Sequence, residues 1–274
     1  MCSNWLMDKI SALINRGLQP EIRTKGLART ARHSSLALPG SQMEPSALAD
    51  ALDAFRPLPP EALFLGVAGD GLPVLLDMHE PSAGAILVVA DPGAGKTSFL
   101  HSLACAAEIL HTSREVQFGV CTPVPGEWDG FAHFPTCVDI LRTSQKEAIS
   151  FLDSLVAWVT GRHSRVQAVL LLLDGLEAVA ELPAHARQLL YWLLRHGPVN
   201  LVWPIVTIDA EKLVQVQGWL PLFRTHIFGP TSGGPSLLGY PQDVRAFDTL
   251  QAEGGYMLRE GGHWLKFHAP DIPA

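Results

Sequence analysis

The sequence predicts an α/β protein of three layers, in which helices cover both faces of a mostly parallel sheet. From about residue 57 on, short continuous apolar runs alternate with amphipathic segments, a pattern typical of parallel strands that are buried on both faces. Right-handed crossovers between such strands place helices on both sides of the sheet. The composition fits, because 47% of the 274 residues are hydrophobic and 17% are charged, which is enough to bury a sizeable core.

The first of two predicted parts, residues 1–58, combines helices with a basic linker. SNWLMDKISALINRGL places its apolar side chains on one stripe and predicts an amphipathic helix. A polar stretch follows, which we interpret as a solvated tether rather than a nucleic-acid contact; its basic residues are Arg23, Lys25, Arg29 and Arg32. PSALADALDAF then predicts a short helix with Leu48, Leu52 and Phe55 on one face.

The second part, residues 59–274, carries the α/β pattern. ALFLGVAGDGLPVLLDM predicts two short strands around a Gly-Asp-Gly turn. Five further apolar runs predict strands, in the order AILVVA, VQFGVC, AVLLLL, NLVWPIVTI and RTHIFG. Helices are predicted between them near residues 97–110, 145–159 and 184–194. This alternation gives the predicted sheet and the helices that cover it.

Charge, cysteines and hydropathy exclude several classes of protein. A net charge of -7 argues against a surface covered with nucleic-acid contacts and leaves room only for a local basic patch. The four cysteines form no CxxC pair and no histidine pair has zinc spacing, so we predict no structural metal site. The apolar runs are far shorter than the roughly 20 residues of a spanning helix, and the N-terminus lacks a secretory pattern. We therefore expect a cytoplasmic protein without a membrane span.

The segment ADPGAGKT, residues 90–97, matches the phosphate-binding pattern GxxxxGK[ST] except at its first position. It follows an apolar strand and opens a predicted helix, which is the context that the motif requires. Its glycines let amide N–H groups converge on a β-phosphate, and the helix N-terminus favours anions. Lys96 brings positive charge to the β- and γ-phosphates, and Thr97 offers a hydroxyl to Mg²⁺. We expect ATP and Mg²⁺ to bind here, with these residues: Ala90, Asp91, Pro92, Gly93, Ala94, Gly95, Lys96, Thr97 and Ser98.

Ala90 stands where this pattern has its first glycine. That glycine mainly relieves crowding where the strand enters the turn. Alanine is therefore tolerable as long as its φ stays negative.

An acidic residue downstream extends the predicted site. Asp174 follows the apolar run AVLLLL, at the carboxyl end of a predicted buried strand. An aspartate there can hold Mg²⁺ through its water shell, together with Thr97. The alternative, an aspartate that only caps the following turn, is less favoured beside the phosphate loop.

The order of these segments resembles the FtsK/HerA-type motor ATPases. FLGVAGDGLPVLLDM leads into AILVVADPGAGKT, Asp174 matches the second acidic strand, and Thr207 in NLVWPIVTID matches a polar sensor. LQAEGGYMLREGGHWLKFHAPDI looks like the closing helix, turn and hairpin of the family. The resemblance runs from about residue 60 to the C-terminus. It implies a P-loop NTPase of RecA/FtsK-like fold with a C-terminal β-hairpin, and self-association into a ring, which is a hexamer in the family.

The departures from this family concern hydrolysis. Members usually carry a glutamate directly after the strand-end aspartate, where it orients or deprotonates the attacking water; here that residue is Gly175, and Glu177 is the nearest carboxylate. A catalytic role for Glu177 and that of a solvated carboxylate at a helix start are evenly balanced. Ile208 and Asp209 replace the usual polar partner after the sensor. The predicted catalytic residues are Lys96, Glu177 and Thr207.

Two hypotheses of function follow. The first is an ATPase that couples hydrolysis to the translocation of DNA or of a protein. The second is a nucleotide-binding switch or scaffold with weak or no hydrolysis, which Gly175 favours. In the second case the N-terminal amphipathic helix could contact a protein partner, although packing on the protein's own core is the commoner fate of such a helix. A small-molecule kinase ranks last, because the sequence offers no Arg-rich lid.

Overall fold

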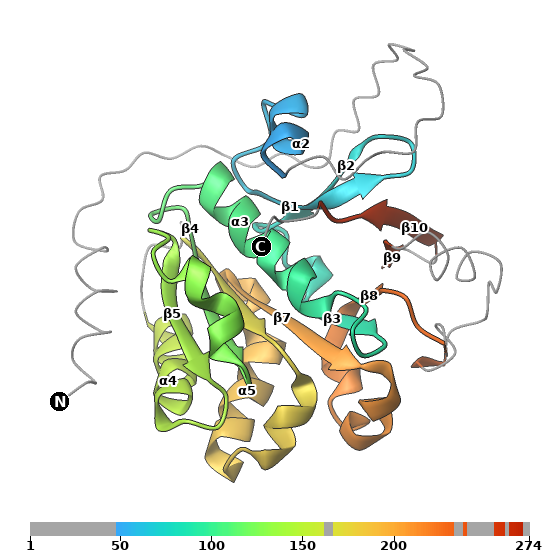
Figure 1. The fold of residues 1–274 in the computed structure, drawn as a ribbon. Helices are drawn as coiled ribbons and strands as arrows, with labels where there is room; N and C mark the ends of the chain where they lie inside the picture. Colours follow the sequence, from blue (N-terminus) through green and yellow to red (C-terminus); the bar gives the residue numbers. More distant parts are fainter. Residues whose placement is uncertain (1–47, 162–166, 233–237, 240–254, 261–262, 271–274) are drawn as a thin grey trace. The chain divides into compact units, whose positions relative to one another are not determined.

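A computed structural model describes residues 48–161, 167–232, 238–239, 255–260 and 263–270. The first predicted helix, the basic linker and most of the predicted closing helix lie outside these residues. The described strands form one sheet of ten, in the order β2-β1-β10-β9-β8-β3-β7-β6-β4-β5 (Figure 1). The strands are β1 (Ala62–Ala68), β2 (Pro73–Asp77), β3 (Ala85–Ala90), β4 (Val116–Thr122), β5 (Cys137–Arg142), β6 (Ala168–Leu173), β7 (Val202–Asp209), β8 (Phe223–Phe228), β9 (Tyr256–Glu260) and β10 (His263–His268).

The sheet has a larger parallel part and a smaller antiparallel part. The strands from β8 to β5 pair in parallel, and all of them except β5 are the continuous apolar runs of the sequence. The hairpin of β9 and β10 joins β8 to β1 and β2 through antiparallel pairs. The predicted fold class, with its mostly parallel sheet and C-terminal hairpin, is confirmed.

Helices cover both faces of the parallel part. Phe118 and Val120 of β4 share an apolar cluster with Phe99 of α3 (Lys96–Leu110). Gly119 between them faces the other side, where a Cβ would lie 2.3 Å from Phe151 of α4 (Lys146–Thr160). Because successive strand residues point to opposite faces, α3 lies on one face and α4 on the other. Helix α5 (Ala184–His196) packs beside α4, and Figure 1 shows α3 along the middle of the sheet.

The short helix α2 (Leu48–Ala54) packs on the antiparallel part. Its residues Leu48 and Leu52 form a cluster with Phe64 and Val67 of β1 and Ala106 of α3. The apolar stripe predicted for this helix is therefore buried against the α/β core. None of the helices among the described residues is long and apolar enough to cross a membrane.

One strand, β5, was not predicted. It lies at the edge of the sheet, and of its six residues only Leu141 is buried. An edge strand that is half exposed lacks the continuous apolar run by which the inner strands are recognised.

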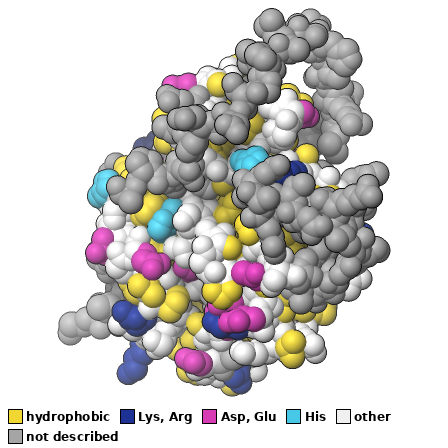
Figure 2. Space-filling model, turned by 45° about the vertical axis from the view of Figure 1, so that its right-hand side comes forward, with side chains coloured by type: hydrophobic (Ala, Val, Ile, Leu, Met, Phe, Trp, Pro, Cys, Tyr) yellow, Lys and Arg dark blue, Asp and Glu magenta, His cyan; other side chains and the backbone are white. Residues whose placement is uncertain are grey.

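On the face drawn in Figure 2, acidic and basic side chains lie close to one another on the part that is not grey.

Candidate functional site

The segment predicted to bind phosphate forms the turn between β3 and α3. Gly93 has a φ of 74° and Gly95 a φ of 80°, in the left-handed region that side chains with a Cβ adopt at a cost. Gly95 is the N-cap of α3, which starts at Lys96. The first N–H groups of a helix have no partner within the helix and attract anions. Pro92 and Ala94 lie in the same turn, and Ser98 is exposed in the first turn of α3.

Ala90 fits at the end of β3 because its neighbour across the sheet is a glycine. A Cβ built on Gly229 would lie 2.9 Å from the Cβ of Ala90, so the missing side chain leaves room for the methyl group. The Gly229 N–H donates to the Val89 carbonyl oxygen at 2.8 Å, which fixes this close approach. Among the described residues other than glycine, only Leu201 has a positive φ, so Ala90 keeps the negative φ that alanine needs.

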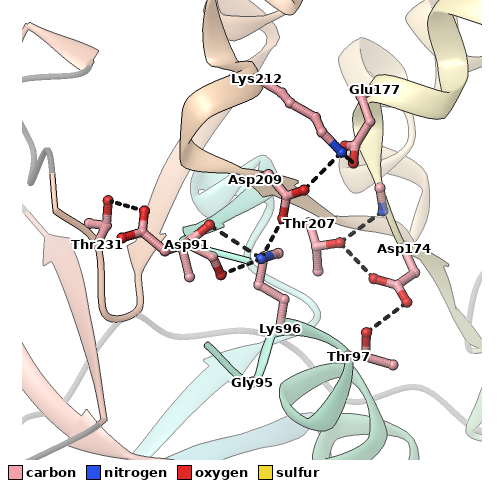
Figure 3. A network of polar contacts seen from close by, with 12 residues as sticks. Asp91, Gly95, Lys96, Thr97, Asp174, Glu177, Thr207, Asp209, Lys212 and Thr231 are labelled. Atoms are coloured by element: carbon pink, nitrogen blue, oxygen red, sulfur yellow. Dashed lines mark hydrogen bonds and ion pairs between the residues drawn. The ribbon is translucent and has the colours of Figure 1, made fainter. Parts of the chain in front are cut away.

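Two threonines hold the Asp174 carboxylate between them (Figure 3). The Thr97 hydroxyl donates to Oδ2 at 2.9 Å, and the Thr207 hydroxyl donates to Oδ1 at 2.8 Å. The Gly175 N–H donates to the Thr207 hydroxyl at 2.9 Å. This arrangement follows from the sheet, because β6 and β7 run in parallel with Leu173 opposite Val206, and the next residues along the chain are Asp174 and Thr207. Thr207 is fully buried, and Asp174 is 9% exposed.

Lys96 is bound to three oxygens. Its Nζ lies 2.7 Å from Asp209 Oδ1, 2.7 Å from the Asp91 carbonyl oxygen and 3.2 Å from the Ala90 carbonyl oxygen. Asp209 ends β7 and pairs with Ala90 in the register of β3 and β7. Sequence reasoning did not assign Asp209 to the site. The sequence does show that Asp209 stands at the carboxyl end of an apolar strand. It does not show that this strand lies beside β3, which is what brings Asp209 to Lys96.

Glu177 belongs to a row of alternating charges that reaches Lys96. Its Oε1 lies 2.9 Å from Lys212 Nζ, and Lys212 lies 2.8 Å from Asp209 Oδ2. Glu177 is in the 3-10 helix η3 (Leu176–Glu181), and Lys212 is in η5 (Ala210–Val216). Lys212 was also missed by sequence reasoning, because it lies 35 residues from Glu177 along the chain.

The charges in this row support one another. Burial of Asp209 opposes its ionisation, but hydrogen bonds from Lys212 and Lys96 outweigh that effect and hold its pKa below the usual value. The hydrogen bonds to Asp209 and Glu177 raise the pKa of Lys212. Asp209 and Lys212 are therefore both charged at neutral pH.

Gly175 has a φ of 94°, again in the left-handed region. A residue with a Cβ is strained there. A glutamate at this position would therefore be strained on this backbone. The sharp turn after Gly175 leads into η3, where Glu177 turns to Lys212.

The segment after β8 and the strand β9 contact the turn between β3 and α3. The Asp91 N–H donates to the Pro230 carbonyl at 2.9 Å, and the Asp91 carboxylate accepts from Thr231 and from the Ser232 N–H. The Tyr256 hydroxyl of β9 donates to the Gly95 carbonyl at 2.9 Å. No sequence motif indicated these contacts.

The oxygens at this site suit Mg²⁺ bound together with a nucleotide. Mg²⁺ prefers a few protein oxygens that are completed by water and phosphate oxygens, and Thr97 and Asp174 offer a hydroxyl and a carboxylate side by side. Among the described residues no group of three or more His, Cys, Asp or Glu side chains could hold a metal by itself. The donor set therefore fits a metal that arrives with a triphosphate.

The chain matches a protein-family model and is similar to several solved structures. Residues 59–173 match the model of the FtsK/SpoIIIE family. The cytoplasmic domain of the type VII secretion ATPase EccC from Thermomonospora curvata is 16% identical, with a TM-score of 0.63, and the match covers 85% of this chain and 33% of that one. EssC, ATPases 2 and 3, from Geobacillus thermodenitrificans is 16% identical, with a TM-score of 0.57 and coverage of 80% and 49%.

A conjugation protein shares the fold as well. The pCW3 conjugation coupling protein TcpA, in its monomer form with ATPγS, is 11% identical, with a TM-score of 0.63, and the match covers 81% of this chain and 69% of that one. At such identities the likeness concerns the fold. The chain spans about a third of the EccC structure and about half of the EssC structure. No curated protein matches the chain.

Proposed function

We propose that this chain is a divergent member of the FtsK/HerA-type P-loop ATPase superfamily, and that it binds Mg-ATP and couples ATP hydrolysis to the translocation of a polymer. One observation carries the proposal. The Thr97 hydroxyl lies 2.9 Å from the Asp174 carboxylate, directly beside Lys96 in a turn that needs its left-handed glycines. Hydroxyl, carboxylate and lysine together are what a metal-bound triphosphate requires.

Each of these residues has a defined part in the proposal. Lys96 neutralises the β- and γ-phosphate oxygens, and the N–H groups at the start of α3 receive the phosphates. Thr97 and Asp174 would hold the Mg²⁺, and the bound metal would supply positive charge next to the phosphates. Thr207 orients Asp174 through its hydrogen bond of 2.8 Å. Thr207, the predicted sensor, thus contacts the proposed metal ligand Asp174. It also accepts a hydrogen bond from the Gly175 N–H, in the turn that leads to Glu177.

Glu177 is the proposed base for the attacking water. Its Oε1 is bound to Lys212, whereas its Oε2 is buried and has no hydrogen-bond partner among the described residues. A carboxylate with one free oxygen can accept a hydrogen bond from water. Such a base accelerates a proton transfer by about 10²- to 10⁴-fold.

The proposed cargo is DNA or a protein, moved by a ring of this chain, a hexamer by family resemblance. The similar proteins support both kinds of cargo, because TcpA is a conjugation coupling protein and EccC is a secretion ATPase whose ATPases 2 and 3 were also solved with a signal sequence peptide. A net charge of -7 favours a protein cargo over a DNA surface. A cytoplasmic location and a protein partner for the N-terminal amphipathic helix belong to the same proposal.

A specific observation favours a second candidate, a nucleotide-binding switch with slow or no turnover. Gly175 leaves no carboxylate directly after Asp174, and Glu177 is held by Lys212. A domain of this kind would bind Mg-ATP and pass the bound state on to a partner surface.

Steady-state turnover of the wild type and of Glu177→Gln, with and without double-stranded DNA, separates these candidates. The proposal expects Glu177→Gln to lower kcat by about 100-fold or more, because the glutamine amide accepts no proton. Glu181→Gln is the matched control, since Glu181 is exposed at the end of the same 3-10 helix. A rate unchanged in Glu177→Gln would remove Glu177 from the mechanism. Tight Mg-ATP binding by a wild type without turnover would establish the switch.

A further inference from the structure

The ammonium group of Lys96 has no donor left for a phosphate. A lysine ammonium carries three N–H donors, and Lys96 Nζ has three oxygens within hydrogen-bond distance. Two of them are carbonyl oxygens of its own turn, from Ala90 and Asp91. The third is the Asp209 carboxylate at 2.7 Å, and the Lys96 side chain is only 11% exposed. A phosphate can bind Lys96 only if one of these oxygens leaves.

Asp209 is the oxygen donor that can leave. The two carbonyls are part of the turn, and the turn is tied to the C-terminal strands through Asp91 and Tyr256. The Asp209 side chain also forms a second ion pair, because its Oδ2 lies 2.8 Å from Lys212 Nζ. When Lys96 turns to a phosphate, Asp209 therefore stays paired.

The same exchange affects Glu177. Lys212 divides its donors between Asp209 at 2.8 Å and Glu177 at 2.9 Å. Once Asp209 has lost Lys96, it attracts Lys212 more strongly, and the bond from Lys212 to Glu177 weakens. Glu177, whose Oε2 is already without a partner in the described part of the chain, then becomes available to water.

We infer that Asp209 is a positioning residue that competes with the nucleotide phosphates for Lys96, and that Lys212 relays the outcome of this competition to Glu177. The inference rests on the proposed function, since it presupposes Mg-ATP at the turn. It gives a role to the two charged residues that sequence reasoning did not assign to the site: Asp209 sets how readily ATP binds, and Lys212 links that binding to Glu177.

The test is the Kd for Mg-ATP, measured by isothermal titration calorimetry on the full chain. Asp209→Asn removes the competing charge and should bind Mg-ATP about tenfold more tightly, as expected for the loss of a partly buried ionic partner. Lys212→Met leaves Asp209 with Lys96 as its one cation and should bind about as much more weakly. The double variant should resemble Asp209→Asn alone. Asp153→Asn, which removes one charge from an exposed position of α4, is the matched control and should not change the Kd.

A second pair of variants tests the link to Glu177. Glu177→Gln gives Lys212 entirely to Asp209, which loosens Asp209 from Lys96 and should tighten binding by about threefold. The same substitution in Lys212→Met should have no effect, whereas a general change in local charge would tighten binding in both backgrounds. An equal effect in both backgrounds would overturn the relay.

The results distinguish a failure of the inference about Asp209 from a failure of the proposed function. If the wild type binds Mg-ATP and Asp209→Asn binds it equally or more weakly, the competition is wrong and the proposed function stands. Weaker binding by both Asp209→Asn and Lys212→Met would mark the row as a structural support only, and would also overturn the inference. If none of these chains binds Mg-ATP, the proposed function is wrong and the inference falls with it.

Discussion

Lys96→Ala should reduce the affinity for Mg-ATP by at least about 100-fold and abolish any turnover. Hydrogen bonds between charged groups contribute about 1.5–3 kcal/mol each, and Lys96 would make more than one of them to the β- and γ-phosphates. The substitution also leaves the Asp209 charge unopposed by Lys96, close to the position of the phosphates. Both effects act in the same direction.

Calorimetry with Mg-ATP measures this loss. Lys146→Ala is the control, because Lys146 is exposed at the start of α4 and its removal changes the net charge equally. If Lys96→Ala binds Mg-ATP within about threefold of the wild type, the phosphates do not lie at this turn, and the assignment of the loop is wrong.

Trp203→Ala should lower the free energy of unfolding by about 3–5 kcal/mol, the range for removing a large aromatic side chain from a core. Trp203 lies in β7 with an exposed fraction of 0%, within the cluster that also includes Phe99 of α3. Its Nε1–H donates to the Met78 carbonyl at 3.0 Å and so joins the centre of the sheet to the segment after β2. The substitution removes apolar contacts and leaves this carbonyl without its donor.

Urea unfolding followed by circular dichroism gives the value. Trp203→Phe should cost less, about 1–2 kcal/mol, because most of the ring volume remains. Trp192→Ala on α5, where the side chain is partly exposed, is the matched control and should cost about 1 kcal/mol or less. A loss below about 1 kcal/mol for Trp203→Ala would show that the packing around β7 is not as described.

The inner part of the fold could be predicted because its signals are local. AILVVA and AVLLLL form β3 and β6 and are buried along their whole length. A strand covered on both faces is apolar at every position, so a continuous apolar run identifies it. The edge strand β5 carries no such signal. The order of the strands, with β10 inserted between β1 and β9, depends on contacts between distant segments, which periodicity does not encode.

The residues of the candidate site could likewise be predicted only where their signal is local. Lys96, Thr97 and Asp174 were found because a motif fixes their spacing or because a strand end marks them. Asp209 and Lys212 were missed because they reach the site only through the adjacency of β3 and β7, and Gly229 was missed because its role is to leave room for Ala90. The site residues that sequence reasoning missed are thus the ones that only tertiary structure brings together.

The central claim is that Thr97 and Asp174 hold a metal that arrives with ATP, and calorimetry with and without Mg²⁺ tests it most directly. The account predicts saturable binding of ATP to the wild type, tightened by about tenfold or more when Mg²⁺ is present, because the metal links the phosphates to the protein. In Asp174→Ala this gain from Mg²⁺ should disappear. An undiminished gain in that variant, or no binding heat for the wild type with Mg-ATP, would contradict the account.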